Sequence, residues 1–264
     1  MRAVVRRLLV AAALVLVLPA TARADPIQQG IVQPRLPSAT PLVELGYQLY
    51  AGNCATCHGA DGRGIPRPTL GAGGQKGQGP PLRGVGALAA DFYLRTGYMP
   101  LSRVGIQPSR STPLFDEHQI RALVAYVASL GGGPAVPSPD FARGSVSRGQ
   151  RLFAEHCAGC HQIAGAGGYV TGAVAPSLEE ATPVQIAEAV RIGPFVMPTF
   201  PESQISDRDL DSIVAYLQEA KHPQDRGGWA LGHIGPVPEG LVTWLLAMAA
   251  LVAACLVIGR RSES

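Results

Sequence analysis

Two copies of the motif Cys-x-x-Cys-His constrain this sequence more than any other feature, at positions 54–58 and 157–161. Two thiols about one helical turn apart can each form a thioether with a haem vinyl group, and the adjoining histidine then lies under the iron as its proximal ligand. A thioredoxin-like redox pair or half of a zinc site shares the cysteine spacing. Two matches inside a repeat favour two covalently bound haem c groups. The candidate thiols are Cys54, Cys57, Cys157 and Cys160, and the candidate proximal ligands are His58 and His161.

The motifs lie inside a longer internal repeat. The segment "GYQLYAGNCATCH", which starts at Gly46, aligns without gaps on "GQRLFAEHCAGCH", which starts at Gly149. Apolar residues at i, i+3, i+4 and i+7 recur from Ile120 and again from Leu210, and both stretches contain the triplet "VAY". This spacing is typical of an amphipathic helix. Each copy is therefore expected to be a small helical domain, in which one helix enters the haem motif and another closes the unit.

Capping signals and loops give the expected boundaries of these helices. The capping pairs are Ser147 with Gln150 for the second entering helix, and Asp116 with Gln119 and Ser206 with Asp209 for the closing helices. Between the helices of each unit we expect a Gly-rich loop, a short helix and a Met-Pro pair. The expected loops are 59–84 and 162–177, and the expected short helices are 87–96 and 183–192.

A second axial ligand is expected on the other face of each haem iron, and methionine is common there in cytochromes c. Met1 lies in the basic and apolar start of the chain, and Met248 lies in an apolar stretch near its end. Met99 and Met197 remain, one per unit, each after its haem motif and directly before proline. We therefore expect Met99 and Met197 to bind the iron. The alternatives are methionines that only fill the core, or a further histidine in a bis-histidine site.

Matching positions in the two copies also suggest partners for the proximal histidines and the haem. A metal-bound histidine usually donates its other ring N–H to a fixed acceptor. "GPPL" and "APSL" take matching places, so the carbonyls of Pro80 and Pro176 are candidate acceptors, unless these prolines only shape the loops. Arg95 and Arg191 also correspond. They could pair with haem propionates, or be exposed helix residues.

The two ends of the chain predict export and a membrane anchor. Residues 1–24 combine a basic start, an apolar run and a small-residue cleavage site before Asp25, as a secretory signal peptide does; an uncleaved anchor is the alternative. Residues 240–259 carry no charge and would span roughly 30 Å as a helix, enough to cross a bilayer. Arg260 and Arg261 follow, which places the C-terminus in the cytoplasm and the rest of the mature chain outside the plasma membrane.

Composition excludes one class of partner and agrees with ordered loops. The formal net charge is +3, with Lys and Arg scattered along the chain, so no nucleic-acid binding is expected. The chain has 32 Gly and 23 Pro, but hydrophobic residues reach 47%. We therefore interpret the Gly- and Pro-rich stretches as long loops that a large cofactor could hold in place.

Each unit resembles a class I cytochrome c domain, with an entering helix, C-x-x-C-H, a Gly- and Pro-rich loop, a Met ligand and a closing helix. The tail from Gly227 to Arg261, together with "FDEHQI" and "GGGP", is similar to the dihaem cytochrome c subunit of actinobacterial cytochrome bcc complexes. The sequence departs from that family in its cleavable signal and in the Gly-rich stretch "GAGGQKGQGP", at 71–80, for which no role is assigned.

The resemblance implies a place in a menaquinol:cytochrome c reductase. A Rieske iron–sulfur subunit would deliver an electron to the first haem, and the second haem would pass it to a haem-copper oxidase. Cytochrome b, the lipid membrane and a dimeric supercomplex would be the other partners. The chain alone would be an electron carrier rather than a catalyst, so no catalytic residue is expected. The alternatives are a subunit of another oxidase, a membrane-tethered electron shuttle, and a dihaem peroxidase.

The expected fold is therefore all-α, with two tandem class I cytochrome c domains and one C-terminal transmembrane helix. The expected segments are a signal peptide (1–24), an N-terminal extension (25–39), cytochrome c domain 1 (40–133), a linker (134–144), cytochrome c domain 2 (145–222), a juxtamembrane loop (223–239), the transmembrane helix (240–259) and a cytoplasmic tail (260–264).

Overall fold

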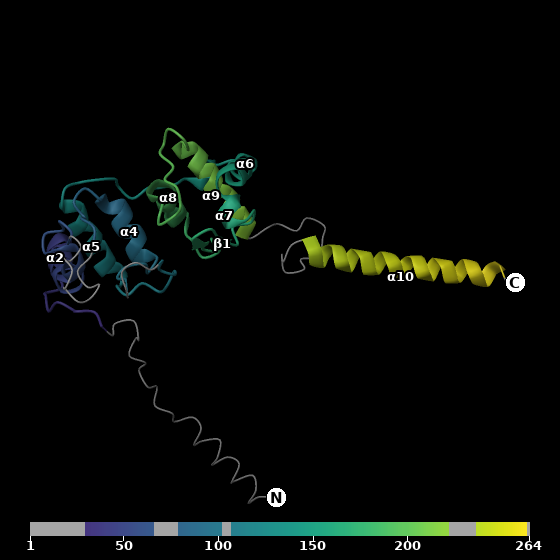
Figure 1. Ribbon diagram of the computed structural model, residues 1–264, viewed down its shortest axis with the longest axis horizontal. Helices are drawn as coiled ribbons and strands as arrows, with labels where there is room; N and C mark the ends of the chain where they lie inside the picture. The colour runs from purple at the N-terminus through teal and green to yellow at the C-terminus, as the bar shows by residue number, and fades with distance from the viewer. Residues whose placement is uncertain (1–29, 66–78, 102–106, 222–235, 263–264) are drawn as a thin grey trace, which may run out of the picture. The chain divides into compact units, whose positions relative to one another are not determined.

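The computed structural model describes residues 30–65, 79–101, 107–221 and 236–262 (Figure 1). They form two compact units. Unit 1 consists of Met1–Pro137 and Glu188–Thr199, and unit 2 consists of Ser138–Ala187 and Phe200–Ser264. The predicted signal peptide, nearly all of the Gly-rich stretch and most of the juxtamembrane loop lie outside the described residues.

The helices and strands follow the order expected from the repeat. Unit 1 contains α2 (Leu42–Asn53), α3 (Ala55–His58), α4 (Gly86–Arg95) and α5 (Glu117–Ser129). Unit 2 contains the 3-10 helix η2 (Phe141–Arg143), α6 (Val146–His156), α7 (Ala158–His161), β1 (Gly168–Val170), β2 (Ala173–Ala175), α9 (Asp207–Lys221) and α10 (Pro236–Ser262). Helix α8 (Pro183–Ile192) begins in unit 2 and continues into the segment Glu188–Thr199 of unit 1. The predicted domain boundaries therefore stay a prediction.

The core of unit 1 lies where α2 and α4 pack against α5. It contains Leu49, Tyr50, Leu94, Phe115, Ile120, Ala122, Leu123 and Tyr126. Burying each large apolar side chain contributes roughly 1.5–3 kcal/mol. At the crossing, Gly46 of α2 lies so close to α5 that a Cβ atom there would overlap the carbonyl oxygen of Ala122. The glycine at the start of the repeat therefore sets how closely the two helices approach.

Unit 2 repeats this crossing with α6 and α9. A Cβ atom at Gly149 would overlap the carbonyl oxygen of Ser212, just as at Gly46. Phe153 and Tyr216 contact each other next to this point, with ring centroids 5.6 Å apart. The apolar stripe of α9 that begins at Leu210 is buried, as its spacing predicted.

One predicted helix cap is wrong. The expected box of Ser147 and Gln150 does not begin α6, because Ser145 is its N-cap and accepts a hydrogen bond from the Arg148 N–H at 3.4 Å. Ser145 keeps an extended backbone because its own N–H donates to the Ser212 hydroxyl of α9 at 3.2 Å. This contact with a distant helix fixes the start of α6, and local sequence does not encode it.

The other two predicted caps are present. Asp116 and Gln119 form a complete capping box at the start of α5. The Ser206 hydroxyl accepts from the Asp209 N–H at 3.2 Å at the start of α9. The closing helix of each unit therefore begins where its sequence predicted.

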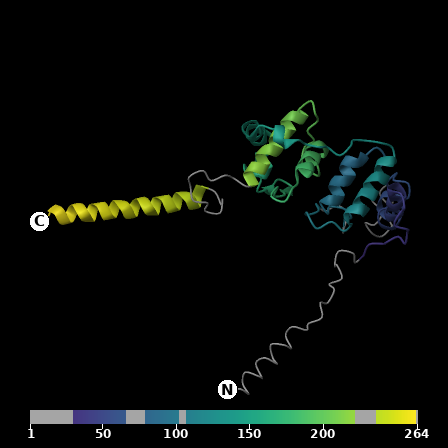
Figure 2. The same ribbon diagram turned by 180° about the vertical axis from the view of Figure 1, so that it is seen from behind.

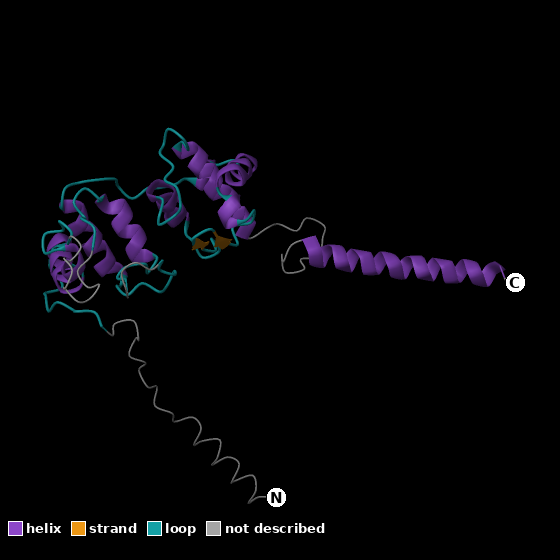
Figure 3. Ribbon diagram, viewed as in Figure 1, coloured by secondary structure: helices purple, strands orange, loops and turns teal. Residues whose placement is uncertain are grey.

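The fold is mostly helical but departs from the all-α expectation at one place. Within the loop predicted for 162–177, β1 and β2 pair antiparallel, with Gly168 opposite Ala175 and Val170 opposite Ala173 (Figure 3). Gly172 has φ 81° in the connecting turn, a conformation that glycine adopts without strain. With only three residues per strand, this hairpin gave no recognisable alternating pattern in the sequence.

Helix α10 has the length and composition of a membrane anchor. Within it, 21 residues, Gly240–Arg260, are apolar enough to cross a bilayer, and they are not buried against the rest of the described chain. The helix is continuous in both views (Figures 1 and 2). A core helix of a soluble protein would be mostly buried, so this exposure agrees with the predicted membrane anchor.

We expect Gly149→Ala to destabilise unit 2 by about 1–3 kcal/mol, because the added methyl group would push α6 away from the α9 backbone. Thermal unfolding of the full chain in detergent, followed by circular dichroism, measures the loss. Gly159→Ala is the matched control, since a Cβ atom there meets nothing within 4 Å. Equal melting temperatures for the two variants would contradict the close crossing.

Candidate haem-binding sites

The first site is built where α2 ends. Cys54 separates α2 from the single-turn helix α3, and its carbonyl accepts from the N–H groups of Cys57 at 3.0 Å and His58 at 2.9 Å. This turn places both thiols and the histidine on one short element. Cys54 and Cys57 are free and partly buried. The structure therefore brings together the three residues predicted to hold the first haem.

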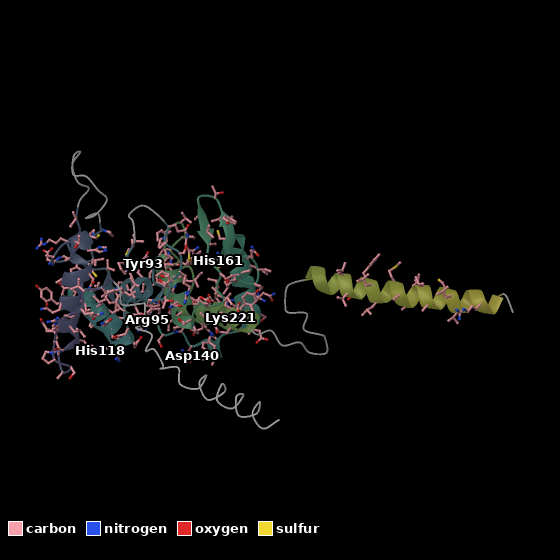
Figure 4. All side chains as sticks on the ribbon, turned by 90° about the horizontal axis from the view of Figure 1, so that it is seen from below. Tyr93, Arg95, His118, Asp140, His161 and Lys221 are labelled. Atoms are coloured by element: carbon pink, nitrogen blue, oxygen red, sulfur yellow. The ribbon has the colours of Figure 1, made fainter. Side chains whose placement is uncertain are left out.

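The second site repeats the arrangement between α6 and α7. The carbonyl of Cys157 accepts from the N–H groups of Cys160 at 3.1 Å and His161 at 2.9 Å. Cys157 is buried, whereas Cys160 is exposed, and both are free. The His161 ring lies within unit 2, where it is labelled in Figure 4.

The histidine of each motif contacts the carbonyl of the candidate proline. His58 Nδ1 lies 2.8 Å from the Pro80 carbonyl oxygen, and His161 Nδ1 lies 3.1 Å from that of Pro176. A carbonyl only accepts hydrogen bonds, so Nδ1 must carry the proton and Nε2 keeps its lone pair. An imidazole with a free Nε2 beside two thiols is the donor set of a c-type haem. The residues present at both sites therefore fit that group.

The loops that carry these prolines are held in the same way in both units. In unit 1, the Gly64 N–H donates to the His58 carbonyl at 2.8 Å and the Leu82 N–H to the Gly62 carbonyl at 2.8 Å. In unit 2, the corresponding bonds run from the Gly167 N–H to the His161 carbonyl at 3.0 Å and from the Leu178 N–H to the Gly165 carbonyl at 2.8 Å. In unit 1 the loop also comes very close to the motif, because a Cβ atom at Gly79 would overlap the Cys57 carbonyl. These contacts place the proline carbonyls beside the Nδ1 atoms of the histidines.

A tyrosine ties each motif to the helix pair, which sequence reasoning missed. The Tyr50 hydroxyl of α2 donates to the Gly59 carbonyl at 2.6 Å, and the Tyr216 hydroxyl of α9 donates to the Ile163 carbonyl at 2.5 Å. Phe153 stands at the place of Tyr50 in the second copy of the repeat. The hydroxyl therefore comes from the entering helix in unit 1 and from the closing helix in unit 2. The only signal in the alignment is the change from Tyr50 to Phe153, because the closing helices carry a tyrosine in both copies, Tyr126 and Tyr216.

Burial favours the uncharged forms of Cys54, Cys157 and His161. Desolvation, and then the neighbouring Cys57, raise the pKa of the Cys54 thiol to about 12. Desolvation, and then Cys160, raise the pKa of the Cys157 thiol to about 11. Burial also lowers the pKa of His161, against the opposing effect of its bond to Pro176. The thiols of Cys54 and Cys157 are therefore protonated and the His161 imidazole neutral at neutral pH.

The two candidate methionine ligands lie in different surroundings. Met99 packs against the same apolar cluster of unit 1 as Cys54, and its N–H donates to the Tyr93 carbonyl at 3.0 Å. Met197 is partly buried in the segment Glu188–Thr199, which belongs to unit 1, whereas His161 belongs to unit 2. Iron ligation by Met99 and Met197 stays a prediction.

Arg95 already has two carboxylate partners in unit 1. Its Nε donates to Asp91 at 2.7 Å and its Nη2 to Glu117 at 3.0 Å, and the residue is labelled in Figure 4. These partners raise the pKa of Arg95 further, chiefly through the bond to Glu117. Sequence reasoning missed both carboxylates. Arg191 is partly buried near the end of α8, and the pairing of either arginine with a haem propionate stays a prediction.

The remaining histidines are His118 and His156, which the structure describes, and two that lie outside the described residues; His156 directly precedes Cys157. His118 is exposed in the first turn of α5. The His156 ring lies against Phe200, with centroids 5.9 Å apart. His222 and His233 lie outside the described residues.

Comparison with known proteins identifies the family. The model of the family described as Cytochrome c matches residues 43–131, and that of Cytochrome C oxidase, cbb3-type, subunit III matches residues 144–217. The cytochrome bc1 complex cytochrome c subunit of Corynebacterium diphtheriae is 38% identical over 239 residues, which cover 84% of this chain and 82% of the relative. That of Mycobacterium bovis is 40% identical over 234 residues, covering 85% and 80%. The chain belongs to the family of cytochrome bc1 complex cytochrome c subunits.

More limited similarities surround this family match. The cbb3-type cytochrome c oxidase subunit CcoP of Rhodobacter capsulatus is 38% identical over 95 residues, covering 33% of this chain and 29% of that protein. A chain of the reducing HAO-like protein complex of Kuenenia stuttgartiensis has 16% identity and a TM-score of 0.34. The match covers 68% of this chain and 98% of that chain. As a member of the bc1 cytochrome c subunit family, the protein is an electron-transfer protein with cytochrome c domains.

In this cytochrome c subunit we expect Tyr50→Phe and Tyr216→Phe each to lower the free energy of unfolding by about 1 kcal/mol, because each removes one hydroxyl bond to a loop carbonyl. Guanidinium unfolding of the full chain in detergent measures both. Tyr169→Phe serves as the control because Tyr169 is 94% exposed. If all three variants unfold at the same denaturant concentration, the two hydroxyl bonds do not stabilise the loops.

Proposed function

We propose that the chain carries two haem c groups and transfers electrons within a quinol-oxidising cytochrome bc complex. The observation that carries the proposal is the repeated site geometry: a Cys-x-x-Cys-His turn whose histidine Nδ1 lies on a proline carbonyl, at 2.8 Å in unit 1 and 3.1 Å in unit 2. Two family models, one per half of the chain, support two cytochrome c domains in tandem.

The roles of the residues follow from their chemistry. Cys54 and Cys57 would anchor the first haem, and Cys157 and Cys160 the second, through thioethers. When bound, haem supplies one-electron redox chemistry at its iron. His58 and His161 would each offer Nε2 to that iron, because Nδ1 is held by a carbonyl. Met99 and Met197 would complete the two ligand sets, and a thioether ligand raises the reduction potential.

Family membership supports a route for the electrons. The relatives are named as subunits of a cytochrome bc1 complex, so cytochrome b and the Rieske iron–sulfur protein are the proposed neighbours. We place the site on His58 nearer the iron–sulfur donor and the site on His161 nearer a haem-copper oxidase, within a dimeric supercomplex. The chain would then act as the redox subunit of a menaquinol:cytochrome c reductase.

Helix α10 would anchor the chain in the plasma membrane. The apolar stretch Gly240–Arg260 ends in arginine, and a further arginine follows it directly. Basic residues at the end of a span favour the cytoplasmic side, so the haem sites would lie on the extracytoplasmic side. This orientation agrees with a secretory signal at residues 1–24.

A second candidate function is a subunit of a cbb3-type oxidase. It is favoured by the family model over residues 144–217 and by the similarity to CcoP over 95 residues. That similarity covers 33% of the chain, whereas the bc1 relatives match 84–85% of it. The bc complex is therefore the better supported assembly.

Haem content tests the two sites. We expect the native chain to carry two haems, and the double substitutions Cys54→Ala/Cys57→Ala and Cys157→Ala/Cys160→Ala to leave one each, because each removes both thioether anchors of one site. The pyridine haemochrome absorbance per mole of protein measures this. Cys255→Ala is the control, since Cys255 lies in α10 outside both motifs. A chain that keeps two haems after either double substitution contradicts the assignment.

Co-purification tests the assembly. A tagged full chain, extracted from its native membranes with mild detergent, should bring down a cytochrome b and an iron–sulfur protein, together with oxidase subunits. Mass spectrometry identifies the partners and haem staining follows the chain. Capture of cbb3-type catalytic subunits without cytochrome b would favour the second candidate. A chain recovered alone with two haems would instead favour a membrane-tethered shuttle.

A further inference from the structure

Unit 1 contains a buried carboxyl group that the proposed electron transfer does not use. Glu188, on α8, is 0% exposed, and Asp91, on α4, is 6% exposed. Neither side-chain oxygen of Glu188 accepts a hydrogen bond from a donor group among the described residues. Leaving such a group buried costs free energy unless it is neutral and its proton has an acceptor nearby.

The charges around Glu188 favour its protonated form. Burial, and then the facing carboxylate of Asp91, raise the pKa of Glu188 to about 9, while Arg95 acts in the opposite direction. Arg95 gives its own hydrogen bonds to Asp91 at 2.7 Å and Glu117 at 3.0 Å. The groups acting on Glu188 are therefore Asp91 and Arg95 from α4, and Glu117 of α5 is engaged through Arg95. One guanidinium serves two other carboxylates, so Glu188 has no cation of its own among these groups.

A second contact joins the same two parts of unit 1 near the candidate methionines. The rings of Tyr98 and Phe195 meet edge to face, with centroids 6.1 Å apart. Tyr98 directly precedes Met99, and Phe195 lies two residues before Met197. The segment Glu188–Thr199 thus meets the α4 region at two places. Glu188 lies beside Asp91, and Phe195, close to Met197 in the sequence, contacts Tyr98.

We propose that Glu188 and Asp91 share one proton and thereby hold the segment Glu188–Thr199 against α4, which makes them positioning residues for the loop that carries Met197. The neutral Glu188 donates its O–H to an Asp91 oxygen, and the charge of Asp91 is balanced by Arg95. When Glu188 ionises, two buried carboxylates face each other and the segment is released. The effect on iron ligation rests on the proposed function of Met197, whereas the carboxyl pair does not.

The direction of the pH dependence follows from linkage. The ordinary pKa of Glu188 is 4.5, and in the held segment it is raised to about 9. The held state therefore binds the proton more tightly than the released state. The equilibrium constant that favours the held over the released segment is largest below pH 4.5. It falls by up to about tenfold per pH unit as the pH rises toward 9.

Hydrogen exchange on the full haem-loaded chain tests the shared proton. Amide protection of residues 188–199, corrected for the intrinsic pH dependence of exchange, should fall at least about tenfold between about pH 6 and pH 8 in the native chain. Glu188→Gln keeps a donor toward Asp91 and cannot ionise, so its protection should stay constant and exceed that of the native chain at pH 8. Glu202→Gln, an exposed glutamate, is the matched control.

Two results would overturn the proposal: a native segment whose protection does not change with pH, or a Glu188→Gln variant that keeps the native pH dependence. Glu188→Ala gives a second check, because it removes the donor and should lower protection at every pH. A structural role without the shared proton would instead leave Glu188→Gln and Glu188→Ala equally protected.

The far-red absorption band of methionine-ligated ferric haem separates this proposal from the proposed function. If Met197 binds iron, part of the band should weaken with rising pH in the native chain and persist in Glu188→Gln. A band that Met197→His leaves unchanged would contradict ligation by Met197. Hydrogen exchange would then still test the shared proton of Glu188 and Asp91, independently of Met197.

Discussion

Both units are organised around a point where two helix backbones touch. At Gly46 and at Gly149 the entering helix lies against a carbonyl of the closing helix, and no side chain larger than hydrogen fits between them. The entering helix runs directly into the motif, so this contact fixes where the two thiols and the histidine begin. The loop and its proline carbonyl are then held against the same turn. The ligand geometry is thus a consequence of helix packing several residues upstream.

Much of this could be predicted because its determinants are local. The Cys-x-x-Cys-His turns, the apolar stripes from Ile120 and Leu210 and the cap at Asp116 are each encoded within a few residues. The proline carbonyls were found because the two copies could be compared. The start of α6 was predicted wrongly, at Ser147 with Gln150. The N-cap is Ser145, and its bond to Ser212, far along the chain, is not visible in the local sequence.

The features that sequence reasoning missed depend on long-range contacts. The hydroxyl bonds of Tyr50 and Tyr216 join residues that only the fold brings together in these geometries. Nothing in the local sequence marks Glu188 as buried, and only the fold buries it beside Asp91. The grouping of Glu188–Thr199 with unit 1 likewise follows from packing and has no signature in the repeat.

The C-terminal helix has a kinetic consequence. A soluble carrier searches a volume, and its encounters depend on its bulk concentration and on salt. A carrier held at one end by an apolar helix of 21 residues explores only a thin layer beside the membrane surface. The effective concentration of its redox sites near membrane-bound partners then depends on tether length instead of expression level. For such a chain, reach and orientation become the quantities that limit turnover.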